Sequence, residues 1–349
     1  MRRILALPLC VCSAAWCAGA QMPRTGDINF YGLHKVTAAE ILSTTGIQTG
    51  GPLPPSKGDL EDRLEQMSGV IQARVTAVCC EGDRAALFIG IEERGAPHAA
   101  FRSDPSGEAS LPQDLLDHYQ QFLTAVARAA VHGNTAEDLT AGHSKMDDPT
   151  ARAFQAGFVE FAKTHLDALR NALHNGSDPD VRAAAAAVIG YGPKTQAVVD
   201  ELQFALDDPE PAVRSNAIRA LAAFIVYAQK NPAVGLKIQP TWFVELLHSV
   251  ELGDREESSK ALVLLTEREG QSKMSEAALD LLRERALPDL AEMARWPTLR
   301  YALPPFLLMG RMAGLPDSET QDRWAKGDRE AVIEKGLATG DAKSKRPPK

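Results

Sequence analysis

The hydrophobic positions of this chain change their spacing between its first part and its later part. Between residues 26 and 94, short runs of alternating apolar and polar residues are separated by stretches with helical spacing. From Gln113 onwards, apolar residues recur three and four positions apart, as on one face of an amphipathic helix. The pattern predicts a multidomain protein, with a small α+β domain at 26–94 followed by an all-α domain at 113–335.

The first domain is expected to run in the order strand, helix, helix, strand, strand. A strand at 28–31 is followed by Thr37 and, three residues later, Glu40, which is the spacing of a helix capping box. Ser56 is positioned to cap a second helix, and the turn residues 81–84 join two alternating runs into a hairpin. The apolar positions of this second helix and hairpin are Leu60, Leu64, Met67, Ile71, Ala73, Val75, Ala77, Leu87, Ile89 and Ile91.

This order of elements and several of the stretches that form it resemble the POTRA domain, the polypeptide-transport-associated module. The resemblance begins at Phe30-Tyr31-Gly32, continues through residues 69–75 and ends in the strand at 87–93. It implies a periplasmic interaction domain that binds partners by adding a strand to the edge of its sheet. POTRA domains usually precede an outer-membrane barrel or follow a membrane anchor. Neither is expected here, so polypeptide transport is not carried over.

Residues 95–112 are rich in Gly, Pro, Ser and Ala and predict a linker. Beyond the helix that starts at Gln113, the loop at 132–149 is the one polar cluster suited to a metal or to acid/base chemistry. Asp148 followed by Pro149 also has the form of a simple helix start, so a plain connection is the competing interpretation. The polar residues of the loop are His132, Glu137, Asp138, His143, Asp147 and Asp148.

Self-similarity dominates residues 165–315. The stretch NGSDPDVRAAAAAVIGYG (175–192) is followed by DDPEPAVRSNAIRALAAF (207–224), so that Arg182 and Arg214 occupy the same position 32 residues apart. The same frame recurs more weakly at Arg255 and Arg300, after 41 and 45 residues. A helix, an Asp-Pro turn and a second helix carrying Val-Arg resemble the HEAT repeat family, whose hairpins stack because none can bury its apolar face alone.

The HEAT resemblance implies a superhelical stack in which the arginine of each repeat bonds carbonyls or acids in the neighbouring turn. Arg182, Arg214, Arg255 and Arg300 are therefore expected to form a structural ladder, and they are also the candidates for contact with a partner. Beyond the stack, the polar end of the chain at 336–349 is expected to be disordered.

The start of the chain has the pattern of an export signal. Arg2 and Arg3 precede an apolar run, and Ala18-Gly19-Ala20 is a small-x-small cleavage site, so residues 1–20 are expected to be removed. Removal of the two arginines takes Lys+Arg from 38 to 36 against 46 acidic residues, a formal net charge of −10. This acidic balance argues against nucleic acid as a partner, and no later stretch is apolar enough for a transmembrane segment. The expected location is periplasmic or secreted.

Only two cysteines, Cys79 and Cys80, remain after the predicted cleavage. Neighbouring side chains on a strand point to opposite faces, so two separate thiols are expected, one of them buried. An intermolecular disulfide is the alternative interpretation.

The chain contains no His-Glu dipeptide, no Gly-x-Ser-x-Gly, no His-Glu-x-x-His and no phosphate-binding loop. The sequence therefore nominates no catalytic, cofactor-binding or metal-binding residue. The leading hypothesis is an exported, non-enzymatic scaffold of the bacterial envelope that binds protein partners. The alternatives are a periplasmic metal-dependent enzyme using the loop at 132–149 and a chaperone-like factor in outer-membrane protein assembly.

Overall fold

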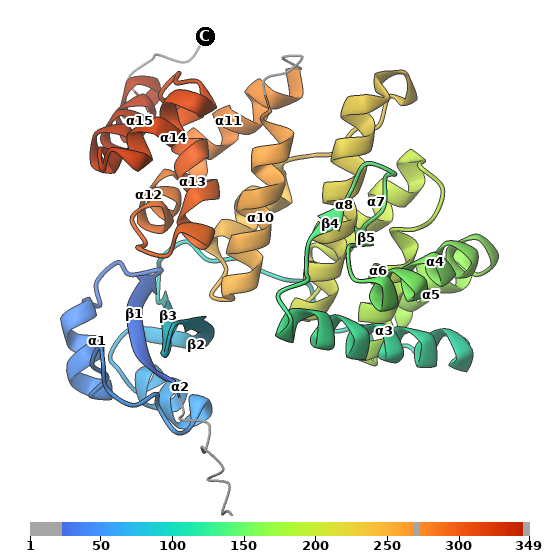
Figure 1. Cartoon of the computed structure of the whole chain (residues 1–349), viewed down its shortest axis with the longest axis horizontal. Coiled ribbons are helices and arrows are strands. Elements are labelled where there is room, and N and C mark those ends of the chain that lie inside the picture. Colours follow the sequence, from blue (N-terminus) through green and yellow to red (C-terminus); the bar gives the residue numbers. More distant parts are fainter. Residues whose placement is uncertain (1–22, 268–272, 345–349) are drawn as a thin grey trace, which may run out of the picture.

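The computed structural model describes residues 23–267 and 273–344 of the 349-residue chain, and the predicted signal peptide at 1–20 lies outside them. A small sheet unit stands beside the C-terminal helices, and the chain then crosses to the far end of the molecule, where the helical part begins (Figure 1). From there the helices return in sequence order to the sheet unit. The first and the last parts of the chain therefore lie side by side.

The sheet unit has the predicted element order. It consists of β1 (Arg24–Tyr31), α1 (Ala38–Thr45), α2 (Lys57–Glu65), β2 (Val70–Glu81) and β3 (Arg84–Glu93). The sheet order is β1-β3-β2, with β1 parallel and β2 antiparallel to β3. Thr37 and Glu40 form the predicted capping box at the start of α1, and a left-handed Gly46 ends that helix.

Both faces of this sheet are covered. On one face, Ile41, Leu60 and Leu64 of the two helices pack with Leu87 and Ile89 of β3. The other face presents Tyr31 and Phe88, both fully buried, to the core of the helical part. Because β3 is buried on both sides, its sequence is apolar almost throughout instead of strictly alternating.

The helical part is a series of stacked hairpins preceded by one long helix. In each of the first two repeats an outer helix is followed by an inner one, and the inner helices α6, α8, α10 and α13 pack against one another in turn. The helices are α3 (Gln113–Val131), α4 (Pro149–Thr164), α5 (Leu166–Asn175), α6 (Pro179–Ile189), α7 (Gln196–Ala205), α8 (Pro211–Lys230), α9 (Thr241–Glu245), α10 (Leu252–Leu265), α11 (Lys273–Arg285), α12 (Leu287–Ala294), α13 (Leu299–Met312), α14 (Asp317–Ala325) and α15 (Arg329–Ser344).

Small residues set how closely the inner helices approach. Four consecutive alanines of α6, at 183–186, are buried, and a Cβ added to Gly190 would lie 2.5 Å from the Cβ of Ala220 in α8. The turns between helices are capped as the sequence indicates, since Asp178 accepts a hydrogen bond at the start of α6 and Pro179 follows it.

Two predictions are corrected here. The tail expected to be disordered from residue 336 is helical as far as Ser344, because α15 continues through it and Gly336 and Gly340 pack closely against α13 and α12. Residues 345–349 lie outside the described part. The two cysteines are not separate thiols: Cys79 and Cys80 are exposed and bonded to each other, where the pairing of β2 with β3 is irregular and strand alternation does not hold.

Candidate functional site

Three of the four repeat arginines occupy equivalent positions. Arg182, Arg214 and Arg255 are each the fourth residue of an inner helix, and each is at most 2% exposed. Each guanidinium donates to a carbonyl of its own hairpin turn and to the carboxylate of the following repeat, which satisfies the charge in the interior. The pairs are Arg182–Asp208, Arg214–Asp254 and Arg255–Asp289, with shortest N–O distances of 3.0, 2.6 and 3.0 Å.

Arg300 is not part of this ladder, and its prediction as a repeat arginine of the same kind was wrong. It lies in the first turn of α13 with its side chain 69% exposed and 3.6 Å from Glu256. The buried arginine of this helix is Arg311, which donates to Thr266 at 2.6 Å and pairs with Asp317 at 2.6 Å. Sequence reasoning missed it because Leu299-Arg300 imitates the Val-Arg of the earlier repeats, whereas Arg311 interrupts an apolar run.

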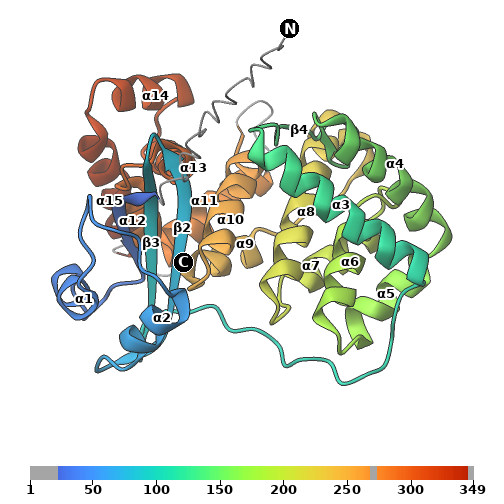
Figure 2. The same ribbon diagram turned by 60° about the horizontal axis from the view of Figure 1, so that its bottom comes forward.

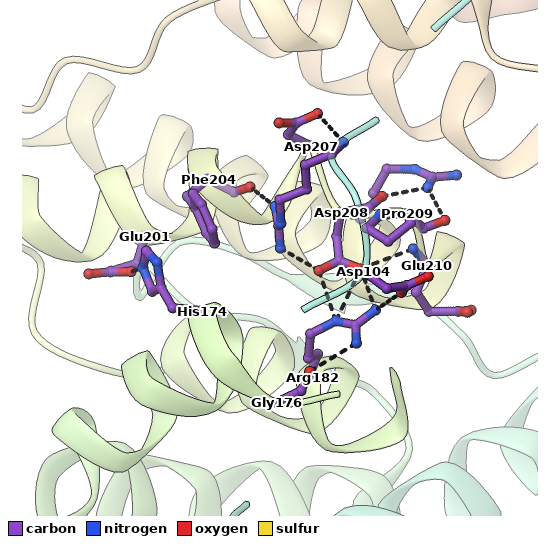
Figure 3. A network of polar contacts seen from close by, with 12 residues as sticks. Asp104, His174, Gly176, Arg182, Glu201, Phe204, Asp207, Asp208, Pro209 and Glu210 are labelled. Carbon is purple, nitrogen blue, oxygen red and sulfur yellow. Dashed lines mark hydrogen bonds and ion pairs between the residues drawn. The ribbon is translucent and has the colours of Figure 1, made fainter. Parts of the chain in front are cut away.

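The linker lies over the ladder. Asp104 pairs with Arg182 at 3.1 Å, and Phe101 stacks on the guanidinium of Arg214, 3.8 Å from its ring centre. Figure 3 shows the guanidinium of Arg182 between the carboxylates of Asp104 and Asp208 and donating to both. The side chain of Arg102 also donates to Asp208. The segment predicted as a linker from its composition therefore covers two rungs, Arg214 with Phe101 and Arg182 with Asp104.

The third rung is covered by the sheet unit itself. The ring of Tyr31 lies 4.9 Å from the guanidinium carbon of Arg255, and its hydroxyl donates to the carbonyl of Val250 at 2.9 Å. A side chain at residue 90 would collide with this ring, because a Cβ on Gly90 would lie 2.3 Å from it. The tyrosine of the Phe-Tyr-Gly stretch thus docks the sheet onto α10.

Helix α12 completes the docking. The backbone N–H of Gly32 donates to Glu292 at 2.9 Å, and the indole of Trp296 donates to the carbonyl of Phe30 at 3.1 Å. Trp296 also meets the ring of Phe88 edge-on at 5.1 Å. Burial raises the pKa of Glu292 to about 7, although the nearby positive charge and this hydrogen bond oppose the rise.

The two edges of the sheet differ in how they are protected. Along β2, the carboxylates of Glu65 and Glu61 accept hydrogen bonds from the backbone N–H groups of Ala73 and Val75, at 3.0 and 2.7 Å. These side chains occupy the positions that an added strand would use. The outer edge of β1 instead borders a groove of about 430 Å³ against α12. Its lining residues are Ile28, Asn29, Phe30, Pro288, Glu292, Arg295, Trp296 and Pro297.

The loop at 132–149 packs against the helices. It forms a two-residue hairpin, β4 (Glu137–Asp138) with β5 (Lys145–Met146), which Figure 1 places beside α8. His143 lies 5.2 Å from the ring of Tyr191, and burial together with neighbouring lysines lowers its pKa to about 4. Asp148 caps α4, as the plain interpretation expects. Across residues 23–267 and 273–344, no three His, Cys, Asp or Glu side chains are grouped to hold a metal ion.

These features define a helical-repeat protein that carries a docked sheet unit at its N-terminal side. Residues 166–234 match the family model described as HEAT repeats, a span that includes α5 to α8 and the rungs Arg182 and Arg214. A search of curated proteins found no match to the chain. In the described part, no helix combines the length and the apolar character that crossing a bilayer requires.

Proposed function

We propose that this protein is an exported, non-enzymatic scaffold of the bacterial envelope that binds an extended segment of a protein partner. HEAT repeats commonly mediate protein–protein interaction, which supports the general class. The signal-like residues 1–20 support export, and the acidic composition disfavours nucleic acid. The β-α-α-β-β order supports the resemblance to a POTRA domain, for which strand addition at a sheet edge is implied.

The observation that carries this proposal is the part of the β1 edge at Ile28, between Thr25, which bonds Gly50 and Gly51, and Phe30. The carbonyl of Phe30 and the N–H of Gly32 point away from β3, since they bond Trp296, which follows α12, and Glu292 within α12. Strand geometry repeats every two residues, so the N–H and carbonyl of Ile28 also point outward. Within the described residues, no hydrogen bond to these two groups of Ile28 is seen outside the sheet. They face the groove and are suited to pair with an added strand.

Proline substitution on this edge tests the proposal. Ile28→Pro removes the outward N–H without removing a bond to β3, whereas Ile28→Ala removes the side chain and keeps the N–H. Tagged mature protein is used to recover partners from an envelope fraction. We expect the wild type and Ile28→Ala to recover the same specific protein and Ile28→Pro to lose it. Equal recovery by both variants, or only background proteins across detergents and salt concentrations, refutes the edge-binding proposal.

Export is tested independently. The proposal expects the protein in the periplasmic or secreted fraction with an N-terminus at Gln21, as read by N-terminal sequencing. A cytoplasmic protein that retains Met1 contradicts it.

A further inference from the structure

Residues 101–108, here called the strap, contact the repeats as a bound peptide would. The N–H of Arg102 donates to the carbonyl of Asp207 at 3.1 Å, and the N–H of Ser177 donates to the carbonyl of Gly107 at 2.9 Å. Glu108 forms an isolated antiparallel bridge with Gly176. The strap itself has no helix or extended ladder, and Figure 2 shows the linker passing the ends of the helices on its way to α3.

Three side chains of the strap, those of Phe101, Arg102 and Asp104, meet groups of complementary chemistry. The aromatic ring of Phe101 covers a guanidinium, the cation Arg102 reaches Asp208 and the carbonyl of Phe204, and the carboxylate of Asp104 faces Arg182. Arg102 also stacks 4.0 Å above the ring of Phe204. The aromatic Phe101, the basic Arg102 and the acidic Asp104 thus each contact residues at the ends of α6, α7 and α8.

The backbone of the strap also packs closely against the repeats. A Cβ on Gly107 would lie 2.3 Å from the carbonyl oxygen of Asn175, so only glycine fits where the strap crosses the end of α5. The strap residues that make these contacts follow the pattern aromatic-basic-x-acidic-x-x-Gly.

The ladder does not depend on the strap for its own satisfaction. Arg182 keeps Asp208 and the carbonyls of Gly176 and Ser177 when Asp104 is removed, and the side chain of Asp104 is 74% exposed. The surface beneath the strap, here called the strap groove, is therefore lined by the repeats, and these bonds of Arg182 do not involve the strap.

We infer that this groove on the ends of α5–α8 is a second peptide-binding site, occupied by the strap and able to take an extended partner segment with the aromatic-basic-x-acidic-x-x-Gly pattern. The tether gives the strap a high effective concentration, so a free peptide competes only when the strap is weakened or drawn away. This surface is separate from the β1 edge, so the inference does not rest on the function proposed above.

The test uses the full chain and a fluorescent peptide, AAFRSDPSGEAS, which copies residues 99–110. A triple variant, Phe101→Ala with Arg102→Ala and Asp104→Ala, weakens the strap by removing its side-chain contacts, and His98→Ala changes an exposed linker residue outside the strap. Fluorescence anisotropy is expected to show the peptide binding the triple variant at least ~10-fold more tightly than the wild type or His98→Ala. Replacing the phenylalanine or the aspartate of the peptide by alanine should weaken this binding.

Absence of binding to a folded triple variant, or equal binding of a scrambled peptide, overturns the inference. If the triple variant does not fold, Asp104→Ala alone serves, because its side chain is largely exposed. This variant is expected to show a smaller gain that is lost with the scrambled peptide, and no gain at all overturns the inference.

Discussion

Replacing Arg214 by methionine should be among the most destabilising single changes in the repeats. Arg214 donates to both carboxylate oxygens of Asp254 at 2.6–3.1 Å and to the carbonyls of Asp208 and Pro209 at 2.7 and 2.9 Å. Methionine preserves most of the volume but removes every donor. Among the described residues, Asp254, which is 2% exposed, is then left with Ser249 as its side-chain partner.

The size of the effect follows from the charge left behind. Burial already raises the pKa of Asp254, against the hydrogen bonds from Arg214 that lower it. Breaking a buried pair by removing one partner costs about 3–5 kcal/mol. We therefore expect the free energy of unfolding, measured by urea denaturation followed by circular dichroism, to fall by about this amount.

Two controls separate this reasoning from a general loss of packing. Arg300→Met removes an exposed arginine of the same sequence frame and should change stability by less than about 0.5 kcal/mol. Combining Arg214→Met with Asp254→Leu removes both charges and should restore much of the loss. The reasoning is refuted if the free energy of unfolding of Arg214→Met lies within about 1 kcal/mol of the wild-type value, or if Arg300→Met lowers it equally.

Two further predictions concern helix packing and docking. Gly190→Ala should lower the melting temperature, because the new Cβ would lie 2.5 Å from that of Ala220. Gly253→Ala should be neutral or stabilising by up to about 1 kcal/mol, because its Cβ would meet no described residue outside its own helix within 4 Å. Equal effects of the two substitutions on the melting temperature would contradict this account. The pKa of Glu292 is about 7 in the native state and 4.5 in the unfolded chain. Between pH 4.5 and pH 7 the carboxyl is therefore protonated in the native state and ionised in the unfolded state. Its contribution to stability, about 3 kcal/mol at most, is therefore lost as pH rises from 4.5 through 7 and is constant above. As pH rises from 4.5 to 8.5, the melting temperature should accordingly fall less in Glu292→Gln than in the wild type. Parallel plots of melting temperature against pH would refute a contribution from Glu292.

Features that depend on residues three or four apart could be predicted from the sequence. The capping box of Thr37 and Glu40 and the cap at Asp148 are of this kind. The positions of Arg182 and Arg214 follow from the repeat frame, although their partners lie 26 and 40 residues away. Each is read within one turn of helix or one copy of a repeat, so the local pattern contains the information. The HEAT match at 166–234 covers the same regular portion.

Features that depend on distant residues could not be predicted. The sequence predicts Tyr31 as the end of a strand, whereas its hydrogen-bond partner, the carbonyl of Val250, is 219 residues away. The protection of the β2 edge by Glu61 could not be predicted either. Nothing in the local pattern of a polar helix face indicates that its carboxylate accepts a hydrogen bond from the backbone N–H of Val75 on the neighbouring strand. The failure at Arg300 has the same origin: only the packing of α13 decides which of its arginines is buried.

The docking contacts join the two proposed binding surfaces. A segment added to β1 would lie against Trp296 and Glu292, which line the groove and also hold the sheet unit on α12. The linker that carries the strap leaves the same sheet unit after β3, so its path over the ladder starts from where that unit is docked. If binding at the β1 edge changes strap occupancy, linkage requires that a peptide displacing the strap changes affinity at the β1 edge by the same coupling free energy.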